Sequence, residues 1–153
     1  MRTAALSKDY QASFSVSASR ETAFSVLTTR IQEWWSPDFS GAGDKIDEKF
    51  TVRFNGSFMT MQIKELVPGK RIVWNCVDSF TNIEALTDKT ELNDTTISWD
   101  ISFENGFTKI DMMHDGLVPE AECYDIGAQR WNLCIYQSLV PFLSTGKGNS
   151  FKG

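Results

Sequence analysis

The chain has 153 residues, enough to bury a sizeable core, and we expect a single domain over residues 1–153. A net charge of −5 and a sequence pI of about 4.9 argue against nucleic acid or an anionic membrane as the main partner. One histidine excludes a multi-histidine metal site, and three cysteines without a C-x-x-C pair complete no metal motif, so we expect no cofactor.

The first predicted elements are a strand and a helix. Residues 10–16 alternate apolar with polar side chains, which predicts a half-buried strand. Ser19 is a suitable N-cap for a helix that continues toward Trp34-Trp35 and carries Phe24, Leu27 and Ile31 on one face. Ser36-Pro37 ends this helical segment, and we assign residues 40–43 to a loop.

Asn55-Gly56 predicts a tight hairpin, and a two-residue loop fixes the register of its strands. Phe50 then lies opposite Met61, and the inward face of this pair of strands also carries Val52, Met59 and Ile63. Pro68-Gly69 makes the next turn and places Trp74 beside Ile63 and Ile72 beside Glu65. Glu48 and Glu65 fall on the inward side near strand ends, where we expect their carboxylates to reach solvent.

Asn105-Gly106 predicts a second hairpin of the same type. It pairs Trp99 with Met112, and its inward face comprises Ile97, Trp99, Ile101, Phe103, Ile110, Met112 and His114. On the other face Asp100 falls opposite Asp111, a like-charge pair that we expect Lys109 to offset diagonally. Residues 79–93 show weak periodicity, and we expect an irregular edge strand in part of them.

A long C-terminal helix is predicted over Ala121–Leu143. At about 1.5 Å per residue it spans roughly 30 Å, the width of a small domain. Its apolar stripe comprises Tyr124, Ala128, Trp131, Ile135, Leu139 and Phe142. Pro141 should bend its last turn, and Gly146 should end it. We therefore expect an α+β fold in which a curved antiparallel sheet closes on this helix.

This order of elements resembles the SRPBCC (START-like) helix-grip superfamily, particularly the branch named after the activator of the heat-shock chaperone ATPase. The most specific similarity lies after Thr108, in His114-Asp115-Gly116-Leu117-Val118-Pro119, Glu122-Cys123-Tyr124-Asp125, Trp131, Ser138-Leu139 and Ser144-Thr145-Gly146-Lys147-Gly148. The resemblance implies about six strands, two short helices, one long C-terminal helix and a deep cavity between sheet and helix. It does not imply one function, because this fold hosts carriers, receptors, cyclases and co-chaperones.

The same cavity can be argued from the residues. The sheet-facing side of the helix carries small residues opposite large ones on the strands, which means either close packing or a void. In a sheet curled around a helix, a void lined by rings and Met is a candidate binding site. The candidate ligand-binding residues are Phe50, Met61, Trp74, Trp99, Met112, His114, Gly127, Trp131 and Cys134.

His114 is the candidate for acid–base chemistry, because an unperturbed imidazole titrates near neutral pH. No second histidine and no evident nucleophile accompany it, so we favour a buried, hydrogen-bonded structural histidine with a lowered pKa. One ring of Trp34-Trp35 should plug the core and the other could cap the cavity mouth. Cys134, on an apolar helix face, should be an unreactive thiol with a raised pKa.

Three functional hypotheses follow. The first is binding of a small apolar or amphipathic molecule in the cavity, without catalysis. The second is an interaction module with a protein partner, resembling the chaperone ATPase activator, and the third is a cyclase- or hydrolase-like enzyme that uses His114. No apolar run approaches the roughly 20 residues of a membrane-spanning helix, Met1–Ser7 lacks a signal-peptide core, and the thiols read as reduced. We therefore expect a cytoplasmic protein without a membrane partner.

Overall fold

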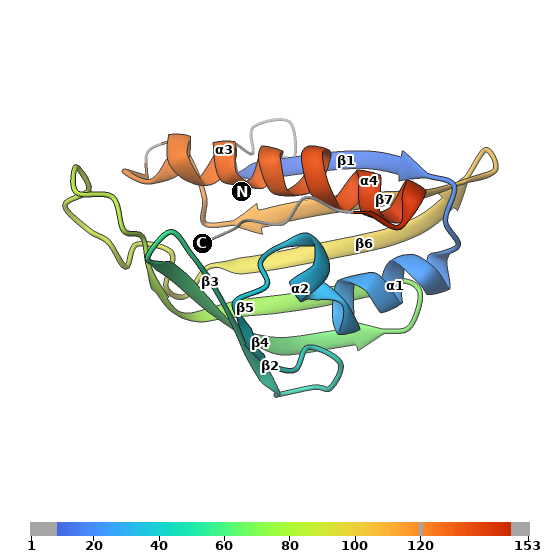
Figure 1. The fold of residues 1–153 in the computed structure, drawn as a ribbon, viewed down its shortest axis with the longest axis horizontal. Helices are drawn as coiled ribbons and strands as arrows, with labels where there is room; N and C mark the ends of the chain where they lie inside the picture. Colours follow the sequence, from blue (N-terminus) through green and yellow to red (C-terminus); the bar gives the residue numbers. More distant parts are fainter. Residues whose placement is uncertain (1–8, 120, 148–153) are drawn as a thin grey trace, which may run out of the picture.

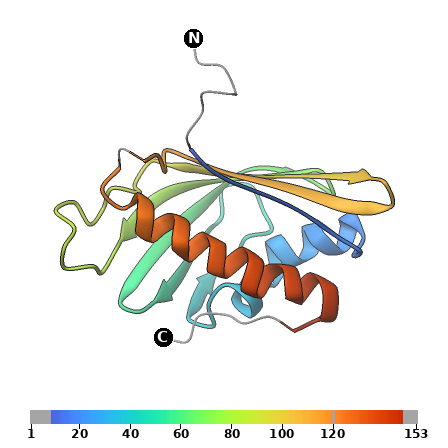
Figure 2. The same ribbon diagram turned by 90° about the horizontal axis from the view of Figure 1, so that it is seen from above.

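The structure is a computed structural model and describes residues 9–119 and 121–147. The predicted segment Met1–Ser7 and Gly148 of the family-like motif lie outside this range. Seven antiparallel strands form one sheet in the order β1-β7-β6-β5-β4-β3-β2. The helices lie on one side of this sheet, and its β2–β3 end curls toward them (Figures 1 and 2). The predicted helix-grip α+β fold is confirmed.

The strands and helices follow one another in the expected order, with one additional strand. The strands are β1 Tyr10–Val16, β2 Phe39–Gly41, β3 Lys49–Phe54, β4 Ser57–Val67, β5 Arg71–Phe80, β6 Thr96–Glu104 and β7 Phe107–Asp115. The helical segments are α1 Arg20–Thr29, α2 Ile31–Trp34, α3 Tyr124–Cys134, the π-helical η2 Ile135–Leu139 and α4 Val140–Thr145. The additional strand is β2, which overlaps the loop predicted at residues 40–43.

Both hairpin registers are confirmed. Phe50 pairs with Met61, and Trp99 pairs with Met112. The turns adopt the left-handed conformation that a two-residue hairpin loop demands, with φ values of 51° and 79° at Asn55-Gly56 and 53° and 83° at Asn105-Gly106. Because asparagine and glycine tolerate positive φ, these dipeptides determine the pairing of the strands on either side.

The register after Pro68-Gly69 is only partly as predicted. Trp74 pairs with Ile63, but an irregularity between Ile63 and Glu65 makes Glu65 the partner of Val73 instead of Ile72. A bulge of this kind shifts alternation by one residue, so the predicted inward position of Glu65 is wrong. Its exposed carboxylate accepts from Arg71 Nε over 3.2 Å.

The inward position of Phe103 is also wrong, because this ring is 60% exposed near the tip of the β6–β7 hairpin. The tip extends past the end of the helical layer (Figure 1), so alternation there no longer corresponds to burial. Likewise, the irregular edge strand expected within residues 79–93 is absent from the described chain. β5 continues to Phe80, and residues 81–95 form a loop.

Asp100 and Asp111 lie opposite each other as predicted, but Lys109 does not offset their repulsion. Lys109 instead approaches Glu104 at 3.5 Å. Arg71 donates to Asp100, and Ser13 Oγ donates to Asp111 Oδ1 over 2.7 Å. The repulsion is therefore relieved from the two flanking strands, which a single hairpin cannot reveal.

The α-helical pattern of the C-terminal helix is interrupted just before Pro141. A five-residue π segment precedes the proline, and the Val140 N–H donates to the Ile135 carbonyl. Proline lacks an N–H and its ring crowds the carbonyl four residues earlier, so a widened turn accommodates it. Gly146, at φ 82°, ends the helix as predicted. Trp131, Ile135, Leu139 and Phe142 of the predicted stripe are buried, whereas Tyr124 and Ala128 are half-buried.

All five tryptophans are buried in one aromatic cluster between sheet and helix. Trp35 stacks on Trp74 with ring centres 6.0 Å apart and lies 5.0 Å from Trp131. Trp74 and Trp99 meet edge to face at 5.5 Å. The Nε1 atoms of Trp74 and Trp99 have no hydrogen-bond partner among the described residues, and neighbouring ring faces are only weak acceptors. These rings fill the middle of the space between the layers.

Candidate functional site

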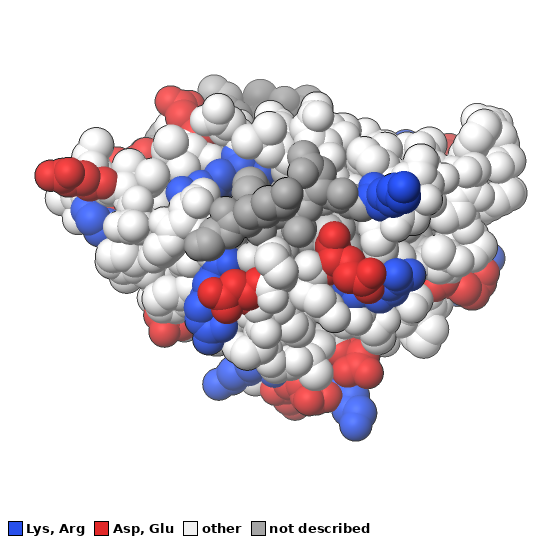
Figure 3. Space-filling view, viewed as in Figure 1, with Lys and Arg blue, Asp and Glu red and all other residues white. Residues whose placement is uncertain are grey.

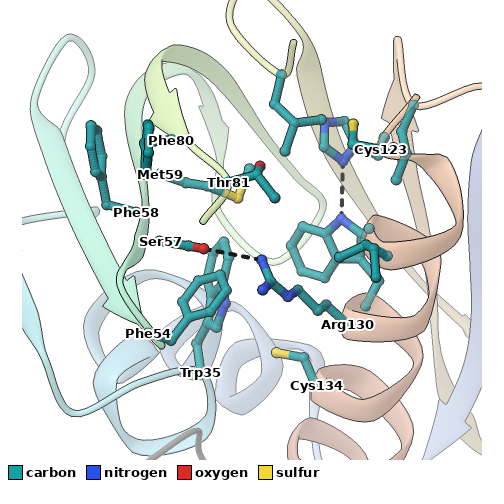
Figure 4. Close-up of a pocket in the computed structure, with 16 residues that line it drawn as sticks. Trp35, Phe54, Ser57, Phe58, Met59, Phe80, Thr81, Cys123, Arg130 and Cys134 are labelled. Atoms are coloured by element: carbon teal, nitrogen blue, oxygen red, sulfur yellow. Dashed lines mark hydrogen bonds between the residues drawn. The ribbon is translucent and has the colours of Figure 1, made fainter. Parts of the chain in front are cut away.

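An apolar recess remains at one end of the aromatic cluster, between α3, the start of β4 and the end of β5 (Figure 4). Its internal volume is about 30 Å³, which leaves room for very few water molecules. The sixteen lining residues are Trp35, Phe54, Ser57, Phe58, Met59, Phe80, Thr81, Leu92, His114, Leu117, Cys123, Ile126, Gly127, Arg130, Trp131 and Cys134.

The structure divides the nine predicted ligand-binding residues into two groups. His114, Gly127, Trp131 and Cys134 line the recess. The other five are buried in the packed core and do not reach it: Phe50, Met61, Trp74, Trp99 and Met112. The tryptophan rings occupy the central space, so the remaining void is displaced toward α3, the first segment of the C-terminal helix. Ligand binding by any of these residues stays a prediction.

Several lining residues escaped the prediction, Arg130 among them. Arg130 lies three positions after Gly127 and four before Cys134, so helical spacing could have indicated it. Met59 lies on the same inward face of β4 as Met61, so alternation along the strand could also have indicated it. Phe80, Thr81 and Leu92 lie in or beside the irregular segment, where periodicity offered no signal.

Gly127 lies against Leu117. A Cβ built at this glycine would lie 3.0 and 3.1 Å from the two Leu117 methyl carbons, closer than most side-chain contacts. A large side chain at this position would therefore displace Leu117 as well as occupy the recess. A substitution designed to fill the recess is therefore better made at another lining residue, one with open space beside it.

His114 takes part in a chain of hydrogen bonds at the inner end of the recess. The Nε1–H of Trp131 donates to His114 Nδ1 over 3.0 Å. The Thr95 hydroxyl donates to the Leu92 carbonyl over 2.6 Å, so its oxygen accepts from His114 Nε2, 2.8 Å away. The imidazole is therefore the neutral Nε2–H tautomer, and both of its nitrogens are engaged.

Burial lowers the pKa of His114 to about 3, and the negative charge of Asp9 opposes this effect. The ring is fully buried, and desolvation disfavours its charged form. The imidazole is thus neutral at pH 7. Its surroundings match the structural role that we favoured, and they leave no ring nitrogen available to transfer a proton.

The loop 81–95 is fastened to the start of α3 by two carboxylates. Glu122 Oε1 accepts from the backbone N–H groups of Thr87 and Asp88 over 2.8 and 2.9 Å. Glu91 in turn accepts from the N–H groups of Glu122 and Cys123 over 3.2 and 3.0 Å. The two backbone bonds lower the pKa of Glu122. This reciprocal arrangement holds the loop residues that line the recess against the helix.

Arg130 extends from α3 across the recess toward β4 (Figure 4). Its Nη1 lies 3.4 Å from Ser57 Oγ, and its Cζ lies 5.1 Å from the centre of the Phe54 ring. The side chain is half-buried, and desolvation lowers its pKa. Within residues 9–119 and 121–147, no carboxylate forms a salt bridge with it. Of the lining residues that the structure describes, it alone carries a charge.

The three cysteines are free thiols, and all are buried. Desolvation raises the pKa of Cys76 and of Cys123 to about 12, and it raises the pKa of Cys134 well above its usual value. Cys123 and Cys134 line the recess, but as protonated thiols they are poor nucleophiles. The recess therefore presents no activated nucleophile from a cysteine.

The remaining candidates have structural positions. Trp34 is fully buried, and its Nε1–H donates to the Val26 carbonyl over 3.0 Å, so it is the core plug. Trp35 lines the recess from within and is only 3% exposed, which is not the position of a cap at the mouth. Glu48 is half-buried, and its backbone carbonyl accepts from the Ile63 N–H. Glu48 does not line the recess.

The charge distribution and the helices give no further site. Acidic and basic side chains are interspersed over the face shown in Figure 3. Within the described ranges, no helix has the length and apolar character needed to cross a membrane. The same ranges contain no group of three or more His, Cys, Asp or Glu side chains arranged to hold a metal ion.

Comparisons with solved structures show the same fold. The Aha1 dimer from Colwellia psychrerythraea, solved in solution, has 23% sequence identity and a TM-score of 0.74, over 92% of this chain and 98% of that one. DynU16, from the dynemicin biosynthetic locus, has 16% identity and a TM-score of 0.69, over 93% and 49%. CalU16 from Micromonospora echinospora has 17% identity and a TM-score of 0.60, over 89% and 74%.

No curated protein matches the chain significantly. Residues 17–144 match the family described as Activator of Hsp90 ATPase homolog 1-like protein. This match covers β2 to β7, the helical segments except the last residue of α4, and the residues that line the recess, but it begins after β1. The chain therefore belongs to the Activator of Hsp90 ATPase homolog 1-like family, within the SRPBCC superfamily that its sequence resembles.

Proposed function

We propose that this protein binds a small apolar or amphipathic molecule in the recess between α3 and the β4–β5 end of the sheet. The observation that carries the proposal is the lining itself, which is aromatic and aliphatic apart from a few polar groups. A concave site of this composition between sheet and helix is typical of small-molecule binding. Membership of a superfamily that includes carriers agrees with this role.

The small volume implies that a ligand enters by displacing side chains. Five lining residues are half-buried and form the accessible part of the recess: Phe58, Phe80, Ile126, Gly127 and Arg130. The others are buried. Rings and long side chains at this edge can change rotamer without disturbing the tryptophan cluster. The mouth of the recess is therefore the part that adapts to a ligand.

Catalysis has less support than binding. His114 is neutral, and both of its nitrogens are engaged in hydrogen bonds. The lining thiols are buried with raised pKa values. A general base must be able to reach and accept a proton, and neither group meets this requirement. The recess is thus better suited to holding a molecule than to transforming it.

The test uses 1-octanol as an uncharged probe and follows the amide and indole signals by NMR. We expect saturable shifts at Leu117, Ile126 and Trp131. Ile126→Phe should fill the mouth and weaken binding about tenfold or more, since a blocked pocket loses most of its apolar contacts. Leu133→Phe, on the same helix but 46% exposed and outside the recess, is the matched control. Shifts that do not saturate, or equal binding by both variants, would count against the proposal.

A protein-interaction role is the second candidate, and two exposed aromatic rings at the tip of the β6–β7 hairpin favour it. Phe103 and Phe107 are 60% and 50% exposed on either side of the β6–β7 turn. Phe103 pairs with Thr108 and Phe107 pairs with Glu104, so the two rings lie on opposite faces of the hairpin tip. Exposed aromatic rings at such a tip are candidates for contact with a protein partner. If the chain stimulates an Hsp90-type chaperone ATPase, as the family description suggests, Phe103→Ser with Phe107→Ser should abolish that stimulation. A control change of Phe58, which lines the recess, should not.

A further inference from the structure

We infer that the molecule held in the recess is an apolar carboxylic acid whose carboxylate pairs with Arg130. This inference rests on the proposed binding function and adds the chemical class of the ligand. The lining combines one cation at the mouth with an apolar interior. A molecule with an ionised head and an apolar body matches both parts.

The first argument is the unsatisfied donor capacity of Arg130. A guanidinium carries five N–H donors and remains charged at all ordinary pH values. Among the described residues its guanidinium has one hydrogen-bond contact, a long one of 3.4 Å from Nη1 to Ser57 Oγ. That hydroxyl oxygen already accepts from the Asn82 N–H over 2.8 Å, so Ser57 is a shared and weak partner. Most of the guanidinium donors are available to a ligand.

The second argument is the cost of leaving this cation uncompensated. Arg130 is half-buried, and no described carboxylate forms a salt bridge with it. Desolvation lowers its pKa, and no acid among the described residues opposes this effect. A carboxylate oxygen pair matches the planar guanidinium in a bidentate geometry and removes this cost.

The third argument is the arrangement of polar and apolar groups. Arg130 and Ser57 lie together beside Phe54, whereas Cys123 lies apart from them, toward the opposite side of the recess (Figure 4). Leu117 and Trp131 add further apolar lining. A carboxylate held by Arg130 would therefore direct its apolar body toward Leu117 and Cys123. The overall charge of −5 does not attract anions at long range, so selectivity has to come from this local cation.

Arg130 also has a structural explanation, which the experiment must separate from ligand binding. Its guanidinium lies over the Phe54 ring at 5.1 Å, and its stem covers apolar surface. A residue that serves packing alone would affect charged and uncharged ligands equally. Preference for an anion over an uncharged molecule of the same length is therefore the decisive measurement.

The experiment compares sodium octanoate with 1-octanol on the full chain at pH 7.5, by isothermal titration and NMR. We expect wild type to bind octanoate more tightly. Arg130→Met keeps an unbranched apolar stem but removes the guanidinium, and it should weaken octanoate binding about tenfold to a hundredfold, the usual effect of losing a charge-assisted pair. Its affinity for octanol should hardly change, and Arg130→Lys should retain part of the preference. Arg20→Met, which removes the same charge outside the recess, is the control.

The outcomes separate this inference from the proposed function. Saturable octanol binding in the recess, without preference for octanoate in wild type, would overturn the anionic ligand and leave the binding function standing. Octanoate binding that Arg130→Met does not weaken would overturn it too. Absence of binding by either probe would overturn both. If Arg130→Met does not fold, the wild-type comparison and Arg130→Lys still decide the question.

Discussion

Trp131 and His114 are joined by a hydrogen bond of 3.0 Å that connects α3 to β7. The same indole lies 5.0 Å from Trp35 and 6.1 Å from Trp99, so it also belongs to the aromatic cluster. Through His114 and Thr95, the bond continues to the Leu92 carbonyl in the loop beside the recess. Helix, sheet and loop therefore meet at one neutral imidazole.

The first prediction concerns the ionisation of His114. Its pKa should be far below 6.5, near 3, because burial excludes the charged ring. NMR titration of the single histidine measures this without overlap from a second imidazole. The folded protein should show no titration of the ring between pH 8 and pH 5. A midpoint above about 6.5 would mean that the ring gains a carboxylate partner or solvent access.

The same shift predicts how stability depends on pH. The unfolded histidine takes up a proton near pH 6.5, whereas the folded one does so only near pH 3. The stability that the neutral ring contributes is thus fully present above pH 6.5 and is lost as the pH falls toward 3. Urea denaturation measures the free energy of unfolding of wild type and His114→Gln. Between pH 7 and pH 5 this free energy should fall less for the variant than for wild type. Parallel curves would contradict the prediction.

The second prediction concerns Trp131. Trp131→Ala should lower the free energy of unfolding by roughly 3–5 kcal/mol, the usual cost of deleting a large buried ring. Trp131→Phe keeps a ring but leaves His114 Nδ1 without its donor, and it should cost about 1–3 kcal/mol. Denaturant melts measure both values. A loss below about 1 kcal/mol for the alanine variant would show a loosely packed ring.

The third prediction concerns the carboxylate that fastens the loop to α3. Glu122→Gln keeps the shape of the side chain but replaces the charged acceptor of the Thr87 and Asp88 N–H groups. A neutral amide oxygen accepts more weakly than a carboxylate, so these two amides should exchange faster with solvent deuterium. Glu84→Gln, an exposed change in the same loop, serves as the control. Unchanged exchange at Thr87 and Asp88 would show that the loop is held by other contacts.

The fourth prediction concerns the three thiols. With pKa values raised by burial, none should react quickly with a disulfide reagent at pH 8 in the folded protein. After unfolding in concentrated guanidinium chloride, all three thiols should react with the reagent. If octanol enters the recess, Cys123 and Cys134 should become still less accessible, whereas Cys76, which does not line it, should not change. One thiol that reacts at once in the native protein would contradict this.

Local chemistry made much of the fold predictable from the sequence. Asn55-Gly56 and Asn105-Gly106 require left-handed turn residues, and this requirement determined two strand registers. Ser19 accepts from the Thr22 N–H as the predicted helix cap. The apolar stripe that includes Trp131 and Leu139 located the C-terminal helix. Each of these signals depends on residues close together in the chain.

Contacts between distant residues decided the rest. Pairing with neighbouring strands decides the bulge before Glu65. It also decides how the repulsion between Asp100 and Asp111 is relieved, because Arg71 and Ser13 lie on the two flanking strands. The position of the recess depends on how five tryptophan rings share one volume, and alternation within a strand does not specify that volume. The sequence alone therefore determined the helix-grip fold and the burial of His114. Only tertiary packing decided where space remains and that Arg130 faces it, because packing depends on the shapes of side chains that lie far apart in the chain.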